Sequence, residues 1–126
     1  MRHLSAYSIF ESQYLRLQRG QRGKISDPWD FRIVNGQYGE GVYAFLHGDQ
    51  DMKKYYTKNG EELHSFKVDK KYVKDLSDTM LDFWEVKKFV YHNPQYKVLI
   101  LKHAGSGIPS SKQVLVLAPE IIVLEK

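Results

Sequence analysis

Four short stretches hold the side chains that could bind a ligand or take part in a reaction. They are "RHLS" at 2–5, "GEGVYAF" at 39–45, "KKYY" at 53–56 and "SSKQVLVLAP" at 110–119. Tyrosines supply flat apolar area that orients an aromatic ligand, and a glycine lets the backbone approach a ligand closely. Their tyrosines and glycines are therefore the first candidates for contact with a ligand.

Several enzyme classes are disfavoured because their motifs are missing. The sequence has no phosphate-binding P-loop, no complete dinucleotide GxGxxG, no HExxH and no GxSxG. Its five histidines lack the i, i+4 spacing with which a helix holds a metal, and there is no cysteine for a thiolate zinc site. We therefore expect no metal cofactor.

In their order and spacing the four stretches resemble the ADP-ribosyltransferase family of poly(ADP-ribose) polymerases, diphtheria-type toxins and small bacterial and phage transferases. Members carry three motifs along a split sheet: a strand with His and Ser/Thr, a GxGxYF-like strand leading to a helix with another tyrosine, and a late strand opened by glutamate. The resemblance covers most of the 126 residues. It implies NAD as the substrate and a protein or nucleic acid as the acceptor of ADP-ribose.

The resemblance also implies which residues hold the dinucleotide. His3 and Ser5 would hydrogen-bond the ribose and the nicotinamide amide. Tyr43 would stack on the nicotinamide ring, and Tyr55 or Tyr56 would cover the opposite face of that ring. Two aromatic side chains would then fix the orientation of the ring.

Gly41 and Gln113 complete the set implied by the resemblance. Gly41 would let the backbone exchange hydrogen bonds with the nicotinamide amide. Gln113 occupies the position of the catalytic glutamate, where the family needs a negative charge to oppose an oxocarbenium-like sugar. A glutamine can orient a ribose hydroxyl but carries no charge. Two functions remain open, namely transfer of ADP-ribose and a catalytically inactive nucleotide-binding module.

Other interpretations of these residues need no ligand. Tyr43 suits the core of a strand, Gly39 and Gly41 suit a bulge or a close backbone approach, and Gln113 suits the solvent-facing start of a strand. None of the nearby carboxylates stands at the position of the missing glutamate. Glu120 lies seven residues further on in a predicted edge or turn, and Glu40, Glu61 and Glu62 could reach a cleft from loops.

Periodicity and turn residues predict the elements that must position these side chains. Apolar residues at helical spacing predict a first helix over Ile9–Gln18. A short helix follows Asp49 or Asp51, and a third runs from Ser77 or Asp78 to about Tyr91. The third helix is predicted to bury Met80, Leu81, Trp84 and Val90.

The remaining elements are predicted to be strands. They cover 31–36, 38–46, 62–69, 96–103 and 113–125, with 71–76 as a strand or an extended loop. Helices grouped early and strands grouped late predict an α+β fold, a single domain over 1–126 with mostly antiparallel strands and two or three helices. The resemblance specifies this further as an ADP-ribosyltransferase-like split sheet.

Composition sets the outer limits of these interpretations. The hydrophobic fraction is 42% and the charged fraction 27%, as in soluble globular proteins, and no apolar run suits a membrane span. The lack of cysteine and of a secretory signal predicts cytoplasmic residence. A net charge of +4 permits an anionic partner, although scattered lysines also suit a solvated surface. A basic protein that contacts RNA or an acidic partner is therefore a third hypothesis.

Overall fold

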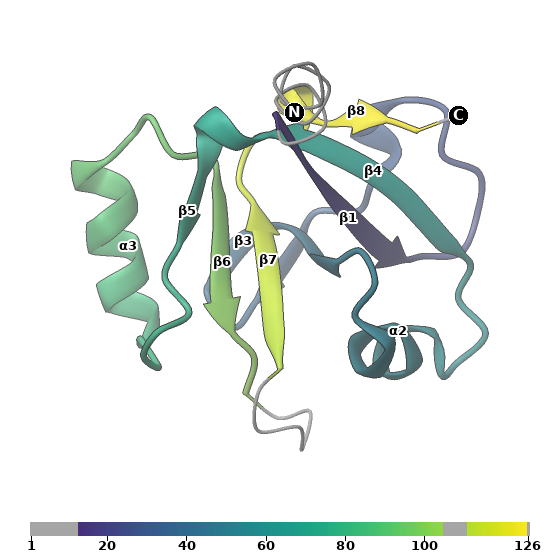
Figure 1. The fold of residues 1–126 in the computed structure, drawn as a ribbon, viewed down its shortest axis with the longest axis horizontal. Helices are drawn as coiled ribbons and strands as arrows, with labels where there is room; N and C mark the ends of the chain where they lie inside the picture. Colours follow the sequence, from purple (N-terminus) through teal and green to yellow (C-terminus); the bar gives the residue numbers. More distant parts are fainter. Residues whose placement is uncertain (1–12, 105–110, 126) are drawn as a thin grey trace, which may run out of the picture.

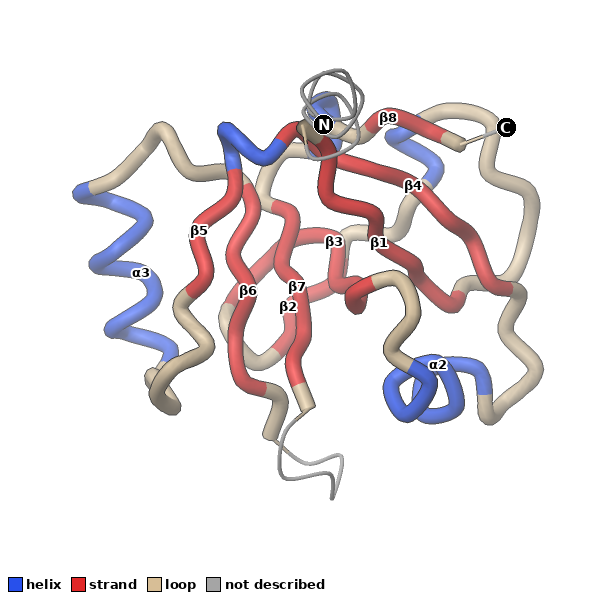
Figure 2. Tube along the Cα trace, viewed as in Figure 1, coloured by secondary structure: helices blue, strands red, loops and turns tan. Residues whose placement is uncertain are grey.

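A computed structural model describes residues 13–104 and 111–125 (Figures 1 and 2). Its strands and α-helices are β1 (Tyr14–Gly20), β2 (Val34–Gly36), β3 (Gly39–Leu46), α2 (Gln50–Thr57), β4 (Leu63–Asp69), β5 (Val73–Asp75), α3 (Phe83–His92), β6 (Val98–Lys102), β7 (Lys112–Val116) and β8 (Val123–Leu124). Three 3-10 turns lie at Pro28–Asp30, Lys70–Tyr72 and Pro119–Ile121. None of the described helices is long and apolar enough to cross a bilayer.

The strands form one sheet in the order β5-β6-β7-β3-β1-β4-β8, and β2 pairs with β3 beside this path. Every pair is antiparallel except β5 with β6. The structure therefore confirms the predicted α+β class with mostly antiparallel strands.

Strand β3 changes partner along its length. Gly39–Gly41 pairs with β2, Val42–Ala44 pairs with β7, and only Phe45 and Leu46 pair with β1. In Figure 1 the β5, β6 and β7 group and the β1, β4 and β8 group diverge on either side of β3. The two groups of strands are thus joined through β3, the middle strand of the sheet.

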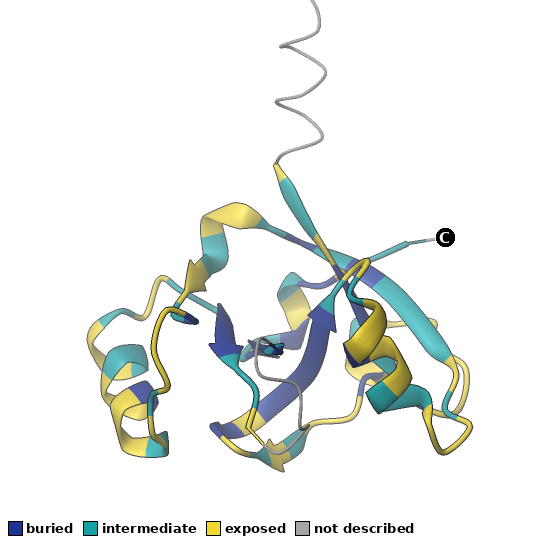
Figure 3. Ribbon diagram, turned by 60° about the horizontal axis from the view of Figure 1, so that its bottom comes forward, coloured by how far each residue is buried: buried dark blue, intermediate teal, exposed yellow. Residues whose placement is uncertain are grey.

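Side chains alternate along β3, and the two faces of the strand contribute to two different apolar clusters. Val42 and Ala44 belong to the cluster that also contains Leu17 of β1. Tyr43 points the other way, into a cluster with Leu115 and with the buried side chain of Val86 on α3. Figure 3 shows the buried residues concentrated on the central strands, while α2 and α3 present exposed outer faces.

The predicted first helix is wrong for the part of it that the structure describes. Tyr14–Gly20 is strand β1, and each of its residues pairs with one residue of β4. The alternation of Leu15 and Leu17 with polar neighbours is the period of a half-buried strand. Pairing on both sides of β1 outweighs the helical spacing of a few apolar residues, because a helix would lose the backbone hydrogen bonds that join this segment to β3 and β4.

Helix α3 begins later than predicted. Asp82 caps it, and Asp82 and Glu85 bond each other's backbone N–H groups in a capping box. Met80 therefore precedes the helix with 52% of its surface exposed, and Trp84 in the first turn is 74% exposed, so their predicted burial is wrong. Leu81 and Val90 do pack against the second apolar cluster.

Candidate ligand cleft

A cleft of about 540 Å³ opens where β1 and β3 diverge. Its walls come from the end of β1, the β2–β3 hairpin, α2, and the chain just after β6 and at the start of β7. Residues far apart in the sequence meet here because β3 exchanges one neighbouring strand for another at this point.

Three of the predicted site residues line this cleft, two predicted to bind NAD and one predicted at the catalytic position. They are Tyr43 on β3, Tyr56 near the end of α2, and Gln113 on β7. Gly41 does not line it. A methyl group at Gly41 would lie 2.7 Å from the carbonyl oxygen of Val116 on β7. The main effect of Gly41 is therefore to allow close packing of β3 on β7.

The other predicted contacts lie elsewhere. Tyr55 does not line the cleft, but its ring meets the ring of Tyr56 edge-on at 5.0 Å, and that of His103 at 5.1 Å. It supports the wall from behind. His3 and Ser5 lie outside the described residues.

Tyr43 is fixed by the hairpin that precedes it. Its hydroxyl donates to the carbonyl oxygen of Gly39 at 2.6 Å and accepts from the backbone N–H of Tyr38 at 2.9 Å. A methyl group at Gly36 would lie 2.7 Å from the ring, so the hairpin backbone covers part of it. Burial raises the pKa of Tyr43, which keeps the phenol neutral. Tyr43 thus both shapes the hairpin and presents its remaining surface to the cleft.

Tyr56 is less enclosed. Its ring stacks on Phe45 with the centroids 5.8 Å apart and the planes within 5°. Burial, with a smaller effect from Tyr55, raises the pKa of Tyr56 to about 12. The side chain therefore offers the cleft an uncharged aromatic group with a hydroxyl at every physiological pH.

Gln113 is held from one side. Its Nε2 donates to Oε1 of Gln37 at 2.8 Å and to the carbonyl oxygen of Lys102 at 3.4 Å, and the residue is only 2% exposed. Within the described part of the chain, Oε1 of Gln113 has no hydrogen-bond donor. This oxygen is the atom that can accept a hydrogen bond from a ligand.

Three arginines in the cleft wall were missed as site residues from the sequence: Arg19, Arg22 and Arg32. Arg19 donates from Nη1 to the carbonyl oxygen of Tyr43 at 2.6 Å and from Nε to Oε1 of Gln21 at 2.9 Å. Burial and, to a smaller extent, the charge of Arg32 lower the pKa of Arg19. Among the described residues none of the three forms an ion pair with a carboxylate. The missing counter-charge is what an anionic ligand would supply.

A signal for Arg19 is present in the sequence once β1 is known. Leu15, Leu17 and Arg19 alternate along the strand, so Arg19 occupies the face that buries Leu17. A charged residue on a buried strand face is unusual and marks a candidate site. The predicted helix over Ile9–Gln18 concealed this alternation.

Glu61 and His103 complete the charged and titratable wall. Glu61 accepts the backbone N–H of Asn59 at 3.0 Å and is the lining carboxylate among the described residues, whereas Glu40 and Glu62 do not line the cleft. Nδ1 of His103 is buried with no hydrogen-bond partner among the described residues, and burial lowers the pKa of His103. Within 13–104 and 111–125, no three His, Asp or Glu side chains are grouped to hold a metal.

The cleft therefore combines an aromatic wall, an amide oxygen and an excess of positive charge. Such a site suits a ligand with both a flat ring and phosphate groups. Comparison of the chain with known proteins matched no family model, no curated protein and no solved structure.

Proposed function

We propose that the chain binds NAD in this cleft, as an ADP-ribosyltransferase-like protein with a split sheet. The observation that carries the proposal is the meeting of Tyr43, Tyr56 and Gln113 in one cavity, from three separate elements. The sequence alone had grouped these residues only through the resemblance to that family. The change of partner along β3 supports the split-sheet architecture.

The arginines add a reason for a dinucleotide. Arg19 and Arg32 lie close enough for the charge of one to lower the pKa of the other, and both lack a carboxylate partner among the described residues. A pyrophosphate would relieve this repulsion, and guanidinium groups match phosphate oxygens in geometry. The phosphates of NAD would therefore lie against the arginines.

The remaining walls would hold the nicotinamide end. Tyr56 offers aromatic area, and Oε1 of Gln113 can accept from a ribose hydroxyl. If the protein is active, it transfers ADP-ribose to a protein or a nucleic acid.

Calorimetric titration with NAD tests this proposal. Arg32→Ala should weaken binding by about 10-fold to 100-fold, because a hydrogen bond to a charged group contributes about 1.5–3 kcal/mol. Arg32 is exposed, and the hydrogen bond that it donates to Oε1 of Gln21 comes from its backbone N–H, so the variant should fold. Lys24→Ala is the matched control, because Lys24 lies in the same loop and does not line the cleft.

Tyr56→Leu gives a second test with its own control. Loss of the aromatic ring should weaken NAD binding. Tyr91 on α3 is 81% exposed and does not line the cleft, so Tyr91→Leu should leave NAD binding unchanged. Tyr43→Ala is less informative because Tyr43 also holds the hairpin. Absence of heat and of a thermal shift at millimolar NAD would reject the proposal.

A second candidate function is a catalytically inactive nucleotide-binding module. The observation that favours it is the neutral amide at position 113, whose Nε2 is already bonded to Gln37 and Lys102. Such a module would bind NAD without releasing nicotinamide, which chromatography of the incubated mixture detects.

A further inference from the structure

We propose that Glu61, from the loop between α2 and β4, is the carboxylate that stabilises the sugar when this protein cleaves NAD. This inference rests on the proposed function. Cleavage of the bond between nicotinamide and ribose develops positive charge on the sugar, and a nearby negative charge lowers that barrier. Gln113 cannot supply that charge, and Glu61 is the carboxylate in the cleft wall of the described structure.

The loop holds Glu61 in a defined position. A methyl group at Gly20 would lie 3.4 Å from Cβ of Glu61, so the residue packs directly beside the end of β1. The next residue is tied to the same strand, because the carbonyl oxygen of Glu62 accepts from the backbone N–H of Gln21 at 2.9 Å. Gly60 precedes it with φ +84°, a backbone conformation that glycine adopts at little cost.

Only one of the two carboxylate oxygens of Glu61 accepts a hydrogen bond from the described part of the protein. Oε1 accepts the backbone N–H of Asn59 at 3.0 Å, while Oε2 has no donor within the described part of the chain. It also forms no ion pair with the arginines that share the cleft. Its negative charge is therefore available to a ligand rather than consumed by a neighbouring guanidinium.

Glu40 and Glu62 differ from Glu61 in their exposure and in their position relative to the cleft. Glu40 is exposed on β3, and Glu62 is exposed with its Oε1 3.5 Å from the backbone N–H of Gly23. Neither lines the cleft. Glu62 is thus a matched control, adjacent in sequence and identical in chemistry.

The reaction balances without a further co-reactant. The bond from the ribose to the nicotinamide nitrogen breaks, and nicotinamide leaves as a neutral molecule with the bonding electron pair. The sugar cation, opposed by Glu61, accepts an electron pair from water or from a hydroxyl or amine of the acceptor. The proton of that nucleophile passes to the Glu61 carboxylate and then to solvent.

Two measurements on the full chain test the role of Glu61. Calorimetry gives the NAD affinity, and chromatography gives the rate of nicotinamide release in water. Glu61→Gln keeps an oxygen for the N–H of Asn59, so NAD affinity should stay within about threefold while release falls about 100-fold. Glu62→Gln should retain both the affinity and the release of the unmodified protein.

Chemical rescue provides a signature that a structural role would not give. Glu61→Ala should lose release by a similar factor, and added formate should restore part of it by placing a small carboxylate in the vacated space. Equal release by Glu61→Gln and the unmodified protein would overturn the inference. So would NAD binding without any release by the unmodified protein, although the binding proposal would then stand. Absence of NAD binding would reject both.

Discussion

At the scale of single residues, Gln113 makes hydrogen bonds that glutamate cannot make. Its Nε2 donates to two oxygens, Oε1 of Gln37 and the carbonyl of Lys102. Oε1 of Gln37 also accepts from the backbone N–H of Ala104 at 3.3 Å, which disfavours rotation of that amide. Gln113→Glu should therefore lower the free energy of unfolding at neutral pH by about 1–3 kcal/mol, as measured by urea denaturation.

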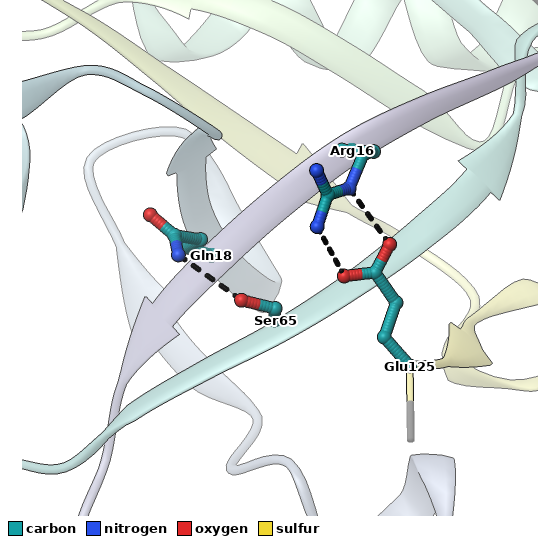
Figure 4. Close-up of polar contacts among 4 residues, drawn as sticks. All are labelled: Arg16, Gln18, Ser65 and Glu125. Atoms are coloured by element: carbon teal, nitrogen blue, oxygen red, sulfur yellow. Dashed lines mark hydrogen bonds and ion pairs between the residues drawn. The ribbon is translucent and has the colours of Figure 1, made fainter. Parts of the chain in front are cut away.

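Gln18 is the matched control for this prediction. It too is buried on a strand, but its Nε2 donates to the hydroxyl of Ser65 at 3.0 Å (Figure 4). A hydroxyl can rotate to donate to a carboxylate instead. Gln18→Glu should thus cost less than Gln113→Glu, and equal losses would contradict the hydrogen-bond explanation.

Tyr56 gives a prediction about high pH. Its pKa rises from 10.0 to about 12 on folding, mainly through burial. A group with a raised pKa contributes stability that is complete below pH 10 and is lost as the pH rises toward 12. Urea denaturation should show this loss, and Tyr56→Phe should reduce it. Tyr91→Phe, on an exposed site, should leave the alkaline loss unchanged.

At the scale of elements, the contact between α2 and β1 depends on Gly20. A methyl group at Gly20 would overlap the backbone carbonyl of Tyr56. Gly20→Ala should therefore displace the end of α2, reduce stability, and weaken NAD binding through Tyr56. Denaturation and calorimetry on the same preparation check both effects.

Substitution of Gly48 distinguishes this steric effect from an effect of backbone strain. Gly48 lies in the turn before α2 with φ +94°, and nothing lies within 4 Å of an added methyl group. Gly48→Ala should cost stability through strain of about 1–3 kcal/mol without moving Tyr56. If it weakened NAD binding as much as Gly20→Ala, the proposed packing of α2 on β1 would be wrong.

The elements differ in how far the sequence predicts them. Capping residues and turn glycines made α2 and β3 predictable, because local chemistry determines where they begin and end. For β1 a local helical spacing competed with pairing to β3 and β4, which is set by residues far away in the chain. Local patterns cannot show such long-range pairing, and the helix prediction failed for that reason.

The candidate site was likewise predictable from the sequence only in part. The aromatic residues and Gln113 were found through their residue types and order, but the arginines were not, because Arg19 acquires its meaning only from its strand position. Glu61 was one of three possible loop carboxylates until the fold placed it in the cleft wall. The residue types indicated which side chains could contact a ligand. The divergence of β1 from β3 determined which of these side chains line the same cleft.

At the scale of the whole molecule, an ion pair joins the first described strand to the end of the chain. Arg16 on β1 donates from Nε and Nη2 to the two carboxylate oxygens of Glu125 at 2.8 and 2.9 Å (Figure 4). Strand β8 is paired with β4 at only Phe66 and Lys67. The two-oxygen contact therefore fixes the last segment where the strand pairing is short.

This contact predicts how stability falls in acid. The hydrogen bonds from Arg16 lower the pKa of Glu125 below its usual 4.5. A group with a lowered pKa contributes stability above pH 4.5 that is lost as the pH falls through the lower folded value. Glu125→Gln should lower the free energy of unfolding by about 0.2–1 kcal/mol in urea denaturation at neutral pH, which is the range of exposed ion pairs. This difference should shrink in acid.

Glu120→Gln, on an exposed site in the last 3-10 turn, is the control. Because β8 and its neighbours lie outside the cleft wall, neither substitution should alter NAD affinity, and a loss with Glu125→Gln would show that the end of the chain influences the cleft.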